Sequence, residues 1–274
     1  MAYDDVPPPA PSPAPSPVQP AQSPAAPVPP RPVAPVGLTA RSFTSWPAWA
    51  DLSLDVVHYG PDIPTEADLR LLGNLDGKRV LELGCGGGPI SVAMAKQGAR
   101  VLAIDSSAEQ IQHARRLAER EEVKVELRQG DYADLAAVRA DTVDIAISVY
   151  SLGVVADLDR VLRQVHRVLR PEAPIVLSLP HPAFRTVDPG GDPPAVRRSY
   201  FDHTPISWLA DGEAGADQPM TISDLFTSLS RANFRVDTVL EPEPARAASR
   251  SRHWTNAMRW LPATLIVRAR KLGI

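Results

Sequence analysis

Cysteine is almost absent from this sequence, because Cys85 is the single one among 274 residues. A lone cysteine excludes an intramolecular disulfide scaffold and favours a reducing compartment, so the expected location is the cytoplasm. Aromatic residues make up only 5% of the chain, and no apolar stretch approaches the length of a membrane span. The first residues show neither the basic start nor the apolar run of a signal peptide. We therefore expect no membrane partner.

Neither sign of charge is in large excess, since the formal net charge is −3. From Ala245 onward seven basic residues occur without an acidic one. A solvated face explains this run better than a nucleic-acid surface, because the whole chain is acidic and few aromatic residues are interleaved there. The six histidines are scattered without the spacing of metal ligands, so no metal site is predicted. Nothing indicates an obligate protein partner.

Proline is abundant in one region, with fourteen prolines among the first 36 residues. Proline donates no backbone hydrogen bond, and the other residues of this segment offer little apolar bulk for a core. We expect residues 1–36 to form an extended, polyproline-like tail. Residues 37–274 are then expected to form the folded domain.

The stretch 80–89 combines an apolar strand pattern with four glycines and a helix start at Pro89. Glycine tolerates positive φ and lets the backbone approach a ligand, while the next helix offers its free N–H groups. Two ligands commonly use this geometry, namely a dinucleotide pyrophosphate and the amino-acid end of S-adenosylmethionine. The dinucleotide fingerprint requires a third glycine where this chain has Pro89. Glu82, two residues before Gly84, would repel a pyrophosphate but attract an ammonium group.

Apolar strand patterns alternate with amphipathic helix patterns from residue 77 onward. This alternation predicts an α/β fold with a parallel sheet and helices on both faces. Asp105 ends the second predicted strand, beside the glycine turn, at the place where ribose hydroxyls are bound in such folds. The predicted strands are 80–83, 100–104, 123–127, 143–148, 175–179, 234–240 and 263–269. The predicted helices cover 66–72, 90–97, 107–118, 158–169 and 221–232, and a short apolar stretch at 46–54 is expected to pack as a further helix.

Between Pro180 and Met220 the periodicity fails, and turn residues dominate. Because this insert leaves the carboxyl end of the fifth predicted strand, it is expected on the ligand side as a lid or acceptor wall. The candidate catalytic residues near the predicted mouth are His58, Tyr59, Tyr150 and His181, although such side chains are more often structural. We expect His181 to be the base or the acceptor's hydrogen-bond partner, because an imidazole titrates near neutral pH, and Tyr150 to face the acceptor with it.

The pattern Glu82-x-Gly84-x-Gly86-x-Gly88 resembles motif I of the class I S-adenosylmethionine-dependent methyltransferases. The resemblance covers roughly 57–269 and implies a doubly wound, mostly parallel, seven-stranded Rossmann-like sheet with a C-terminal antiparallel hairpin. It also implies that S-adenosylmethionine is the cofactor. The family's Arg-Val-Leu-Lys-Pro-Gly-Gly turn is replaced here by residues 167–173, which lack both glycines.

A set of cofactor contacts follows from the same resemblance. The glycine turn would hold the methionine part, Asp105 the ribose, 130–132 the adenine amino group, and 148–151 would lie under the sulfonium. The cofactor-binding residues implied are Tyr59, Glu82, Gly84, Cys85, Gly86, Gly88, Asp105, Ser106, Asp131, Tyr132 and Ser148. At Cys85, packing in the tight turn explains the residue better than a nucleophile does, since no histidine is near it in sequence.

The resemblance implies transfer of a methyl group to a small-molecule acceptor by in-line displacement. Residues 148–151 stand where amino-group nucleic-acid methylases carry Asn/Asp-Pro-Pro-Tyr, so base methylation is disfavoured. The alternatives are an NAD(P)-dependent reductase and a cofactor-binding module without turnover. In this interpretation 37–76 form an N-terminal cap segment, 77–179 the cofactor-binding core, 180–222 the lid or acceptor insert, and 223–274 the last helix and hairpin.

Overall fold

The structure is a computed structural model that describes residues 52–210, 213–246 and 250–273. All of them belong to one structural unit of the chain, Ala34–Ile274. The expected tail, residues 1–36, lies outside the described residues, as does the apolar stretch up to residue 51. Residues 52–54, which end that stretch, form no helix.

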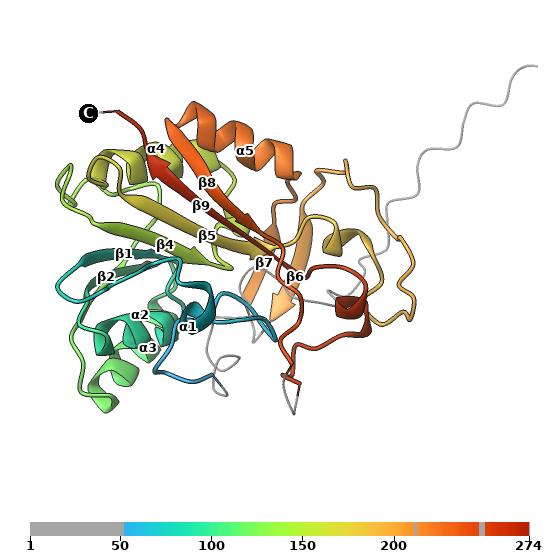
Figure 1. Cartoon of the computed structure of the whole chain (residues 1–274), viewed down its shortest axis with the longest axis horizontal. Coiled ribbons are helices and arrows are strands. Elements are labelled where there is room, and N and C mark those ends of the chain that lie inside the picture. Colours follow the sequence, from blue (N-terminus) through green and yellow to red (C-terminus); the bar gives the residue numbers. More distant parts are fainter. Residues whose placement is uncertain (1–51, 211–212, 247–249, 274) are drawn as a thin grey trace, which may run out of the picture. The chain divides into compact units, whose positions relative to one another are not determined.

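A seven-stranded sheet forms the centre of the fold (Figure 1). Its strand order is β3-β2-β1-β4-β5-β9-β8. The strands from β3 to β5 are parallel, whereas β9 is antiparallel to both β5 and β8. This arrangement confirms the predicted doubly wound sheet with its antiparallel C-terminal hairpin. The bounds are β1 (Arg79–Leu83), β2 (Arg100–Asp105), β3 (Val125–Gln129), β4 (Ile145–Val149), β5 (Pro174–Pro180), β8 (Phe234–Leu240) and β9 (Thr264–Lys271).

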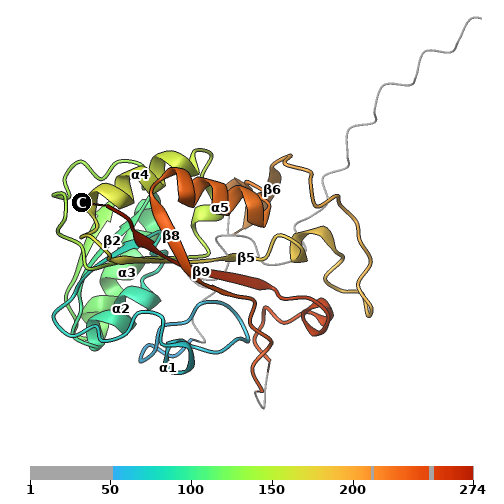
Figure 2. The same cartoon turned by 45° about the horizontal axis from the view of Figure 1, so that its top comes forward.

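Helices cover both faces of this sheet (Figures 1 and 2). Successive strand residues point to opposite faces, so Leu81 and Leu83 pack in the core with α4 and α5, while Val80 packs in the core with α2. The central strand β4 is buried along its whole length, as expected between two helical layers. The helices are α1 (Glu66–Leu69), α2 (Pro89–Lys96), α3 (Ala108–Arg120), α4 (Leu158–Val168) and α5 (Ile222–Arg231), and none of these described helices is long and apolar enough to cross a membrane.

Helix α1 is shorter than predicted, because it ends at Leu69 rather than at residue 72. Arg70 adopts a left-handed conformation there. The buried Glu66 carboxylate then accepts hydrogen bonds from the next three backbone N–H groups, those of residues 71–73. A charged side chain thus satisfies backbone donors that a longer helix would have used internally.

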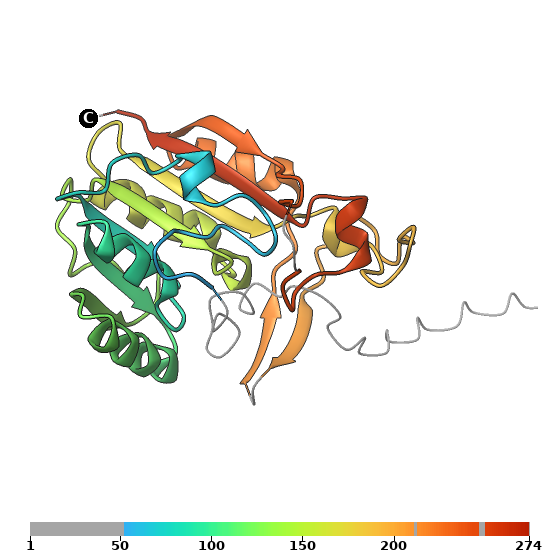
Figure 3. The ribbon, with the colours of Figure 1, turned by 60° about the horizontal axis from the view of Figure 1, so that its bottom comes forward.

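The insert 181–220 contains regular structure that the sequence interpretation missed. A short 3₁₀ helix, η2 (Phe184–Thr186), is followed by an antiparallel hairpin of β6 (Ile206–Ala210) and β7 (Glu213–Asp217). The hairpin, orange in Figure 3, stands off from the carboxyl ends of the parallel strands. The second strand, β7, consists of small and acidic residues and shows no apolar alternation, but the dipeptide at 211–212 is Asp-Gly, a strong sequence signal for a hairpin.

A second segment joins the insert at the carboxyl edge of the sheet. It connects β8 to β9 and contains the 3₁₀ helix η3 (Asn256–Arg259). Phe184 of the insert packs with Ala257, Met258 and Ala263 of this connection in a small apolar cluster of their own. We call residues 181–205 and 250–263 together the cap (Figures 1 and 3). The cap places two segments that are distant in sequence at the ligand side of the sheet.

Candidate cofactor and acceptor site

The glycine turn follows β1 and is held tightly against its neighbours. The N–H groups of Gly84 and Cys85 both donate to the Ile104 carbonyl oxygen, at 2.7 and 3.1 Å. Gly84 has a φ of +75°, and a Cβ placed on it would lie 2.1 Å from Ser151 Cβ. Gly88 has a φ of +87° and meets Ala114 in the same way. No other residue type fits at these two positions without moving the backbone.

Glu82 lies under this turn and is fully buried. Its Oε2 accepts a hydrogen bond from the Ser91 hydroxyl of α2, whereas its Oε1 has no partner within the described part of the chain. The pKa of Glu82 is raised to about 7, mainly by burial, with the Ser91 hydrogen bond opposing the shift and the nearby Asp105 adding to it. An unpartnered buried carboxylate oxygen is costly unless a donor completes it. A cationic ligand group beside the glycine turn would supply that donor.

Asp105 ends β2 and is also buried. Its Oδ2 accepts from the N–H of Gly86, and its Oδ1 accepts from the N–H of Ser107, both at 2.9 Å. The carboxylate therefore connects the glycine turn to the start of α3. Hydroxyl groups are natural donors to a carboxylate, so ribose binding by Asp105 stays a prediction. The fold thus brings the two acids, Glu82 and Asp105, to the same turn as predicted.

The other predicted cofactor contacts lie around the same turn. Tyr132 is buried, and its hydroxyl would lie 3.1 Å from a Cβ on Gly84. Asp131 and Ser106 are exposed, and Asp131 accepts a hydrogen bond from the N–H of Ala133. Direct contact of these three residues with a cofactor stays a prediction.

A chain of hydroxyl groups links β4 to β1 beneath the turn. The hydroxyl oxygens of Ser148 and Ser151 are 2.5 Å apart, and Ser151 donates to the Leu83 carbonyl oxygen at 2.6 Å. Ser148 is fully buried and therefore acts on the turn through Ser151. The sequence interpretation singled out Ser148 and missed the role of Ser151. The only signal in the sequence was that a second serine, Ser151, follows Ser148 by three residues. The interpretation also missed Ser91.

Cys85 is buried in the turn, and burial raises the pKa of its thiol, with the two neighbouring carboxyl groups adding to the effect. A thiol held neutral in this way is a poor nucleophile. Its sulfur donates only a long hydrogen bond, 3.7 Å to the Gly86 carbonyl oxygen. These features fit the interpretation of Cys85 as a small side chain packed in a tight turn.

Tyr59 and Tyr150, the two tyrosines among the catalytic candidates, are fully buried. The hydroxyl of Tyr59 donates to Glu66 Oε2 at 2.6 Å, and that of Tyr150 lies 2.6 Å from the Thr264 hydroxyl oxygen. Burial raises the pKa of each phenol, and for Tyr59 the Glu66 carboxylate adds to the shift. A phenol in this environment stays protonated, so neither ring is suited to accept a proton. Cofactor binding by Tyr59 and catalysis by Tyr150 stay predictions.

His181 follows β5, and both of its ring nitrogens are engaged. Nδ1 accepts from the N–H of Ala183 at 3.1 Å, which leaves Nε2 as the protonated nitrogen that donates to Glu241 Oε1 at 2.8 Å. The ring thereby ties the insert to the end of β8. His58 is different, because burial lowers its pKa and its buried Nε2 has no partner within the described residues. The catalytic roles of both histidines stay predictions.

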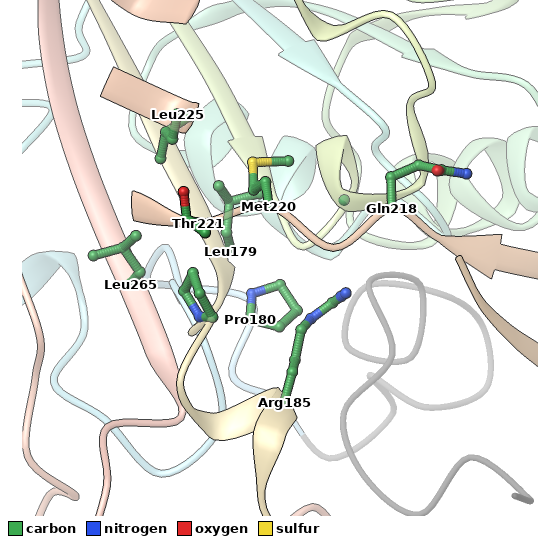
Figure 4. A pocket seen from close by; sticks show the side chains of 10 residues that line it. Leu179, Pro180, Arg185, Gln218, Met220, Thr221, Leu225 and Leu265 are labelled. Atoms are coloured by element: carbon green, nitrogen blue, oxygen red, sulfur yellow. The ribbon is translucent and has the colours of Figure 1, made fainter. Parts of the chain in front are cut away.

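A pocket lies between the ends of β4 and β5, the cap and the start of α5 (Figure 4). Gly153 of the 3₁₀ helix η1 (Leu152–Val154) lines it, two residues after the Ser151 that contacts the glycine turn. Leu179, Met220 and Leu225 supply apolar walls, and Arg185 reaches in from η2. The pocket is therefore adjacent to the glycine turn, on the side where an acceptor was predicted. Within the described residues, no three His, Cys, Asp or Glu side chains are grouped to hold a metal ion.

Comparison with known proteins is consistent across sequence and structure. Residues 80–172 match a family model described as a methyltransferase domain. An S-adenosylmethionine-dependent methyltransferase from Mesorhizobium loti shares the fold with a TM-score of 0.63 and 27% identity, over 75% of this chain and 96% of that one. Residues 80–172 therefore form a methyltransferase domain, within a fold that is similar to that of S-adenosylmethionine-dependent methyltransferases. The shared fold extends well beyond the residues that the family model matches.

The methyltransferase domain also resembles curated enzymes over part of its length. The ubiquinone biosynthesis O-methyltransferase of Xanthomonas oryzae pv. oryzae is 37% identical over 105 residues, which are 38% of this chain and 44% of that protein. The enzyme of the same name from Bordetella avium is 39% identical over 102 residues, 37% of this chain and 42% of that protein. The chain thus matches less than half the length of these relatives. The acceptor is therefore inferred from the site.

Replacing Asp105 with alanine tests the ribose assignment. We expect the variant to bind S-adenosylhomocysteine more weakly by about 1–3 kcal/mol, because charge-assisted hydrogen bonds to two hydroxyl groups are lost. Calorimetric titration measures the change, and circular dichroism checks the fold, since Asp105 also anchors Gly86. An unchanged dissociation constant in a folded variant would rule the assignment out.

Proposed function

We propose that the protein transfers a methyl group from S-adenosylmethionine to a small-molecule acceptor that binds in the pocket beside the glycine turn. One observation carries this proposal: the buried, unpartnered Glu82 Oε1 lies at a turn whose glycines cannot carry side chains. That oxygen suits the ammonium group of the cofactor's methionine part and would repel a pyrophosphate. The domain's relatives support the same cofactor. A dinucleotide-dependent reductase is therefore the weaker alternative.

Different residues around the turn would bind different parts of the cofactor. Glu82 would hold the ammonium group, the turn N–H groups and the start of α2 the carboxylate, and Asp105 the ribose hydroxyls. When bound, S-adenosylmethionine supplies a methyl group on a sulfonium, which is already a good leaving group. The chain's own contribution is placement, and holding two reactants at near-attack distance can supply about 7–11 kcal/mol of a barrier.

A base is needed only if the acceptor holds its proton firmly. As that base, His181 would have to leave its hydrogen bonds with Ala183 and Glu241. These two hydrogen bonds support a structural role for His181. The cytoplasm remains our proposed location, on the ground of the single cysteine.

Replacing His181 with alanine separates these two roles. We expect a loss of about 1–3 kcal/mol in the free energy of unfolding, because a hydrogen bond to a carboxylate is removed at the junction of the cap and β8. Turnover per folded molecule should then stay nearly unchanged. A fall of on the order of 10²-fold in turnover at unchanged stability would instead establish His181 as the base. Glu241→Gln, which keeps an acceptor for Nε2, is the matched control.

Two experiments test the proposed function as a whole. Calorimetric titration with S-adenosylhomocysteine and with NADH should show binding of the first alone. Incubation with a methyl-labelled donor and fractionated cell extract should then place the label on a small molecule. Tight binding of S-adenosylhomocysteine without transfer to any fraction would favour the remaining alternative, a cofactor-binding module without turnover.

A further inference from the structure

Strand β3 forms one edge of the seven-stranded sheet. Its five residues pair with β2 in continuous register, and no other strand of the described residues pairs with it. Strand β8 forms the opposite edge, and its pairing with β9 is irregular between Val236 and Thr238. An irregularity of this kind protects an edge, because it hinders the addition of a further strand. Strand β3 has no such protection.

The backbone of β3 presents hydrogen-bonding groups along its outer side. The N–H of Gly130, directly after β3, donates to the Asp105 carbonyl oxygen of β2 at 2.9 Å, so residue 130 points toward β2. The N–H and C=O groups of successive strand residues point to alternate sides. Those of Val125, Leu127 and Gln129 therefore point away from β2. An added antiparallel strand would find its donors and acceptors at these three residues.

Two opposite charges share one face of β3. Arg128 Nε donates to Glu126 Oε1 at 3.0 Å, and the two side chains are 38% and 52% exposed. The side chains of Val125 and Leu127 lie on the other face, where they pack against the core beneath α3. An added strand would thus meet apolar side chains on one face and a pair of charges on the other.

The order of these charges suits a second copy of the same strand. With a twofold axis at Glu126, two glutamates would face each other, and Lys124 would face the second copy's arginine. With the axis at Arg128, two arginines would face each other. With the axis at Leu127, Glu126 of each copy faces Arg128 of the other. Opposite charges on facing strands attract and like charges repel, so only the last register is favoured.

We propose that the protein forms a symmetric dimer in which the β3 strands of two copies pair antiparallel about Leu127. In this register the outward-pointing residues 125, 127 and 129 face residues 129, 127 and 125 of the second copy. Each of these pairs exchanges two backbone hydrogen bonds. The Glu126 and Arg128 pairs then occupy the positions between them, where facing side chains lie closer.

A groove beside β3 supports the same partner. It is lined by Arg115 and Glu119 of α3 together with Val125 and Leu127 of the strand. Both faces of the edge therefore offer one basic and one acidic residue beside apolar ones. A twofold axis brings identical surfaces together, so each copy can meet the charges of the other with opposite charges of its own.

Charge reversal tests the dimer in the full chain. Sedimentation equilibrium at micromolar concentrations should show that the wild type forms dimers. Glu126→Arg and Arg128→Glu each place like charges opposite one another at both symmetric pairs, so each should raise the dissociation constant about tenfold or more. A mixture of the two variants restores opposite charges at every pair and should associate about as tightly as the wild type. The double exchange Glu126→Arg/Arg128→Glu should also restore the dimer.

The matched control is Arg163→Glu. Arg163 is an exposed residue of α4, outside β3 and α3, so its reversal should leave the dissociation constant unchanged. Circular dichroism checks that each variant folds. Amide hydrogen exchange of the wild type gives a second measurement that needs no variant. The N–H groups of β3 should exchange about tenfold or more slowly at concentrations where the dimer forms than at high dilution.

Several results would overturn the proposal. A wild type that stays monomeric at high micromolar concentration would do so, and this is the outcome expected if residues before 52 cover the edge instead. Equal dissociation constants for the two reversal variants and the Arg163 control would also overturn it. So would a mixture of the two variants that does not associate, or a dimer whose β3 amides exchange as fast as those of the monomer.

Discussion

Gly84→Ala is expected to lower the free energy of unfolding by about 2–5 kcal/mol, a large part of the stability of an ordinary domain. Two costs add up at this position. The φ of +75° is unfavourable for any residue with a Cβ, and the new methyl group would lie 2.1 Å from Ser151 Cβ. No rotation of the serine side chain relieves this overlap, because the backbone fixes the position of its Cβ. Binding of S-adenosylhomocysteine should be lost with the turn.

The matched control is Gly130→Ala, directly after strand β3. A Cβ on Gly130 meets no atom within 4 Å, and its φ is not in the left-handed region. We expect this substitution to change the free energy of unfolding by less than about 1 kcal/mol. Urea unfolding of both variants measures the difference. Equal stability of the two variants would contradict the close approach of Ser151 to the turn.

The affinity for S-adenosylhomocysteine should rise with pH and level off near pH 7. Glu82 has a pKa raised to about 7 in the free protein, and its ionised form is the one that holds an ammonium group. Below pH 7 the ligand must displace a proton, so the affinity should fall by up to about tenfold per pH unit. In Glu82→Gln this dependence should disappear, and binding should be weaker at neutral pH by about 1.5–3 kcal/mol. Calorimetry in buffers of different ionisation enthalpy would detect the released proton.

The same carboxyl group links stability to pH in the absence of ligand. Its pKa rises from 4.5, the ordinary value, to about 7 on folding. The stabilisation is therefore complete below pH 4.5 and is lost as the pH rises to about 7, by up to about 3 kcal/mol. Glu82→Gln should not show this loss. Identical pH profiles of unfolding for the two proteins would show that Glu82 ionises freely in the folded state.

Much of the fold could be predicted because its signals are local. The strand before the glycine turn and the helix start at Pro89 both lie where the sequence indicated. Helix α1 was predicted too long, because the backbone donors after it are taken by the side chain of Glu66. The periodicity of a segment does not report such a contact.

The same distinction between local signals and contacts distant in sequence applies to the candidate site. Glu82 and Asp105 could be predicted, since each stands at a fixed offset from a strand end. The partners of His181 and Arg185 could not, because Glu241 and Asp217 lie 60 and 32 residues away along the chain. Only the folded chain brings them together. The sequence therefore showed which side chains reach the carboxyl edge but not which of them are already bound to another protein group.

The two halves of the site have different origins along the chain. Apart from Tyr59, the predicted cofactor contacts come from one continuous stretch, from β1 to β4, whereas the pocket draws on segments near residues 153, 180, 218 and 265. We therefore expect substitutions in the cap to change the acceptor and to leave the binding of the methyl donor intact. Swapping the insert and the β8–β9 connection between two relatives of this domain should exchange their substrates while leaving donor affinity in place.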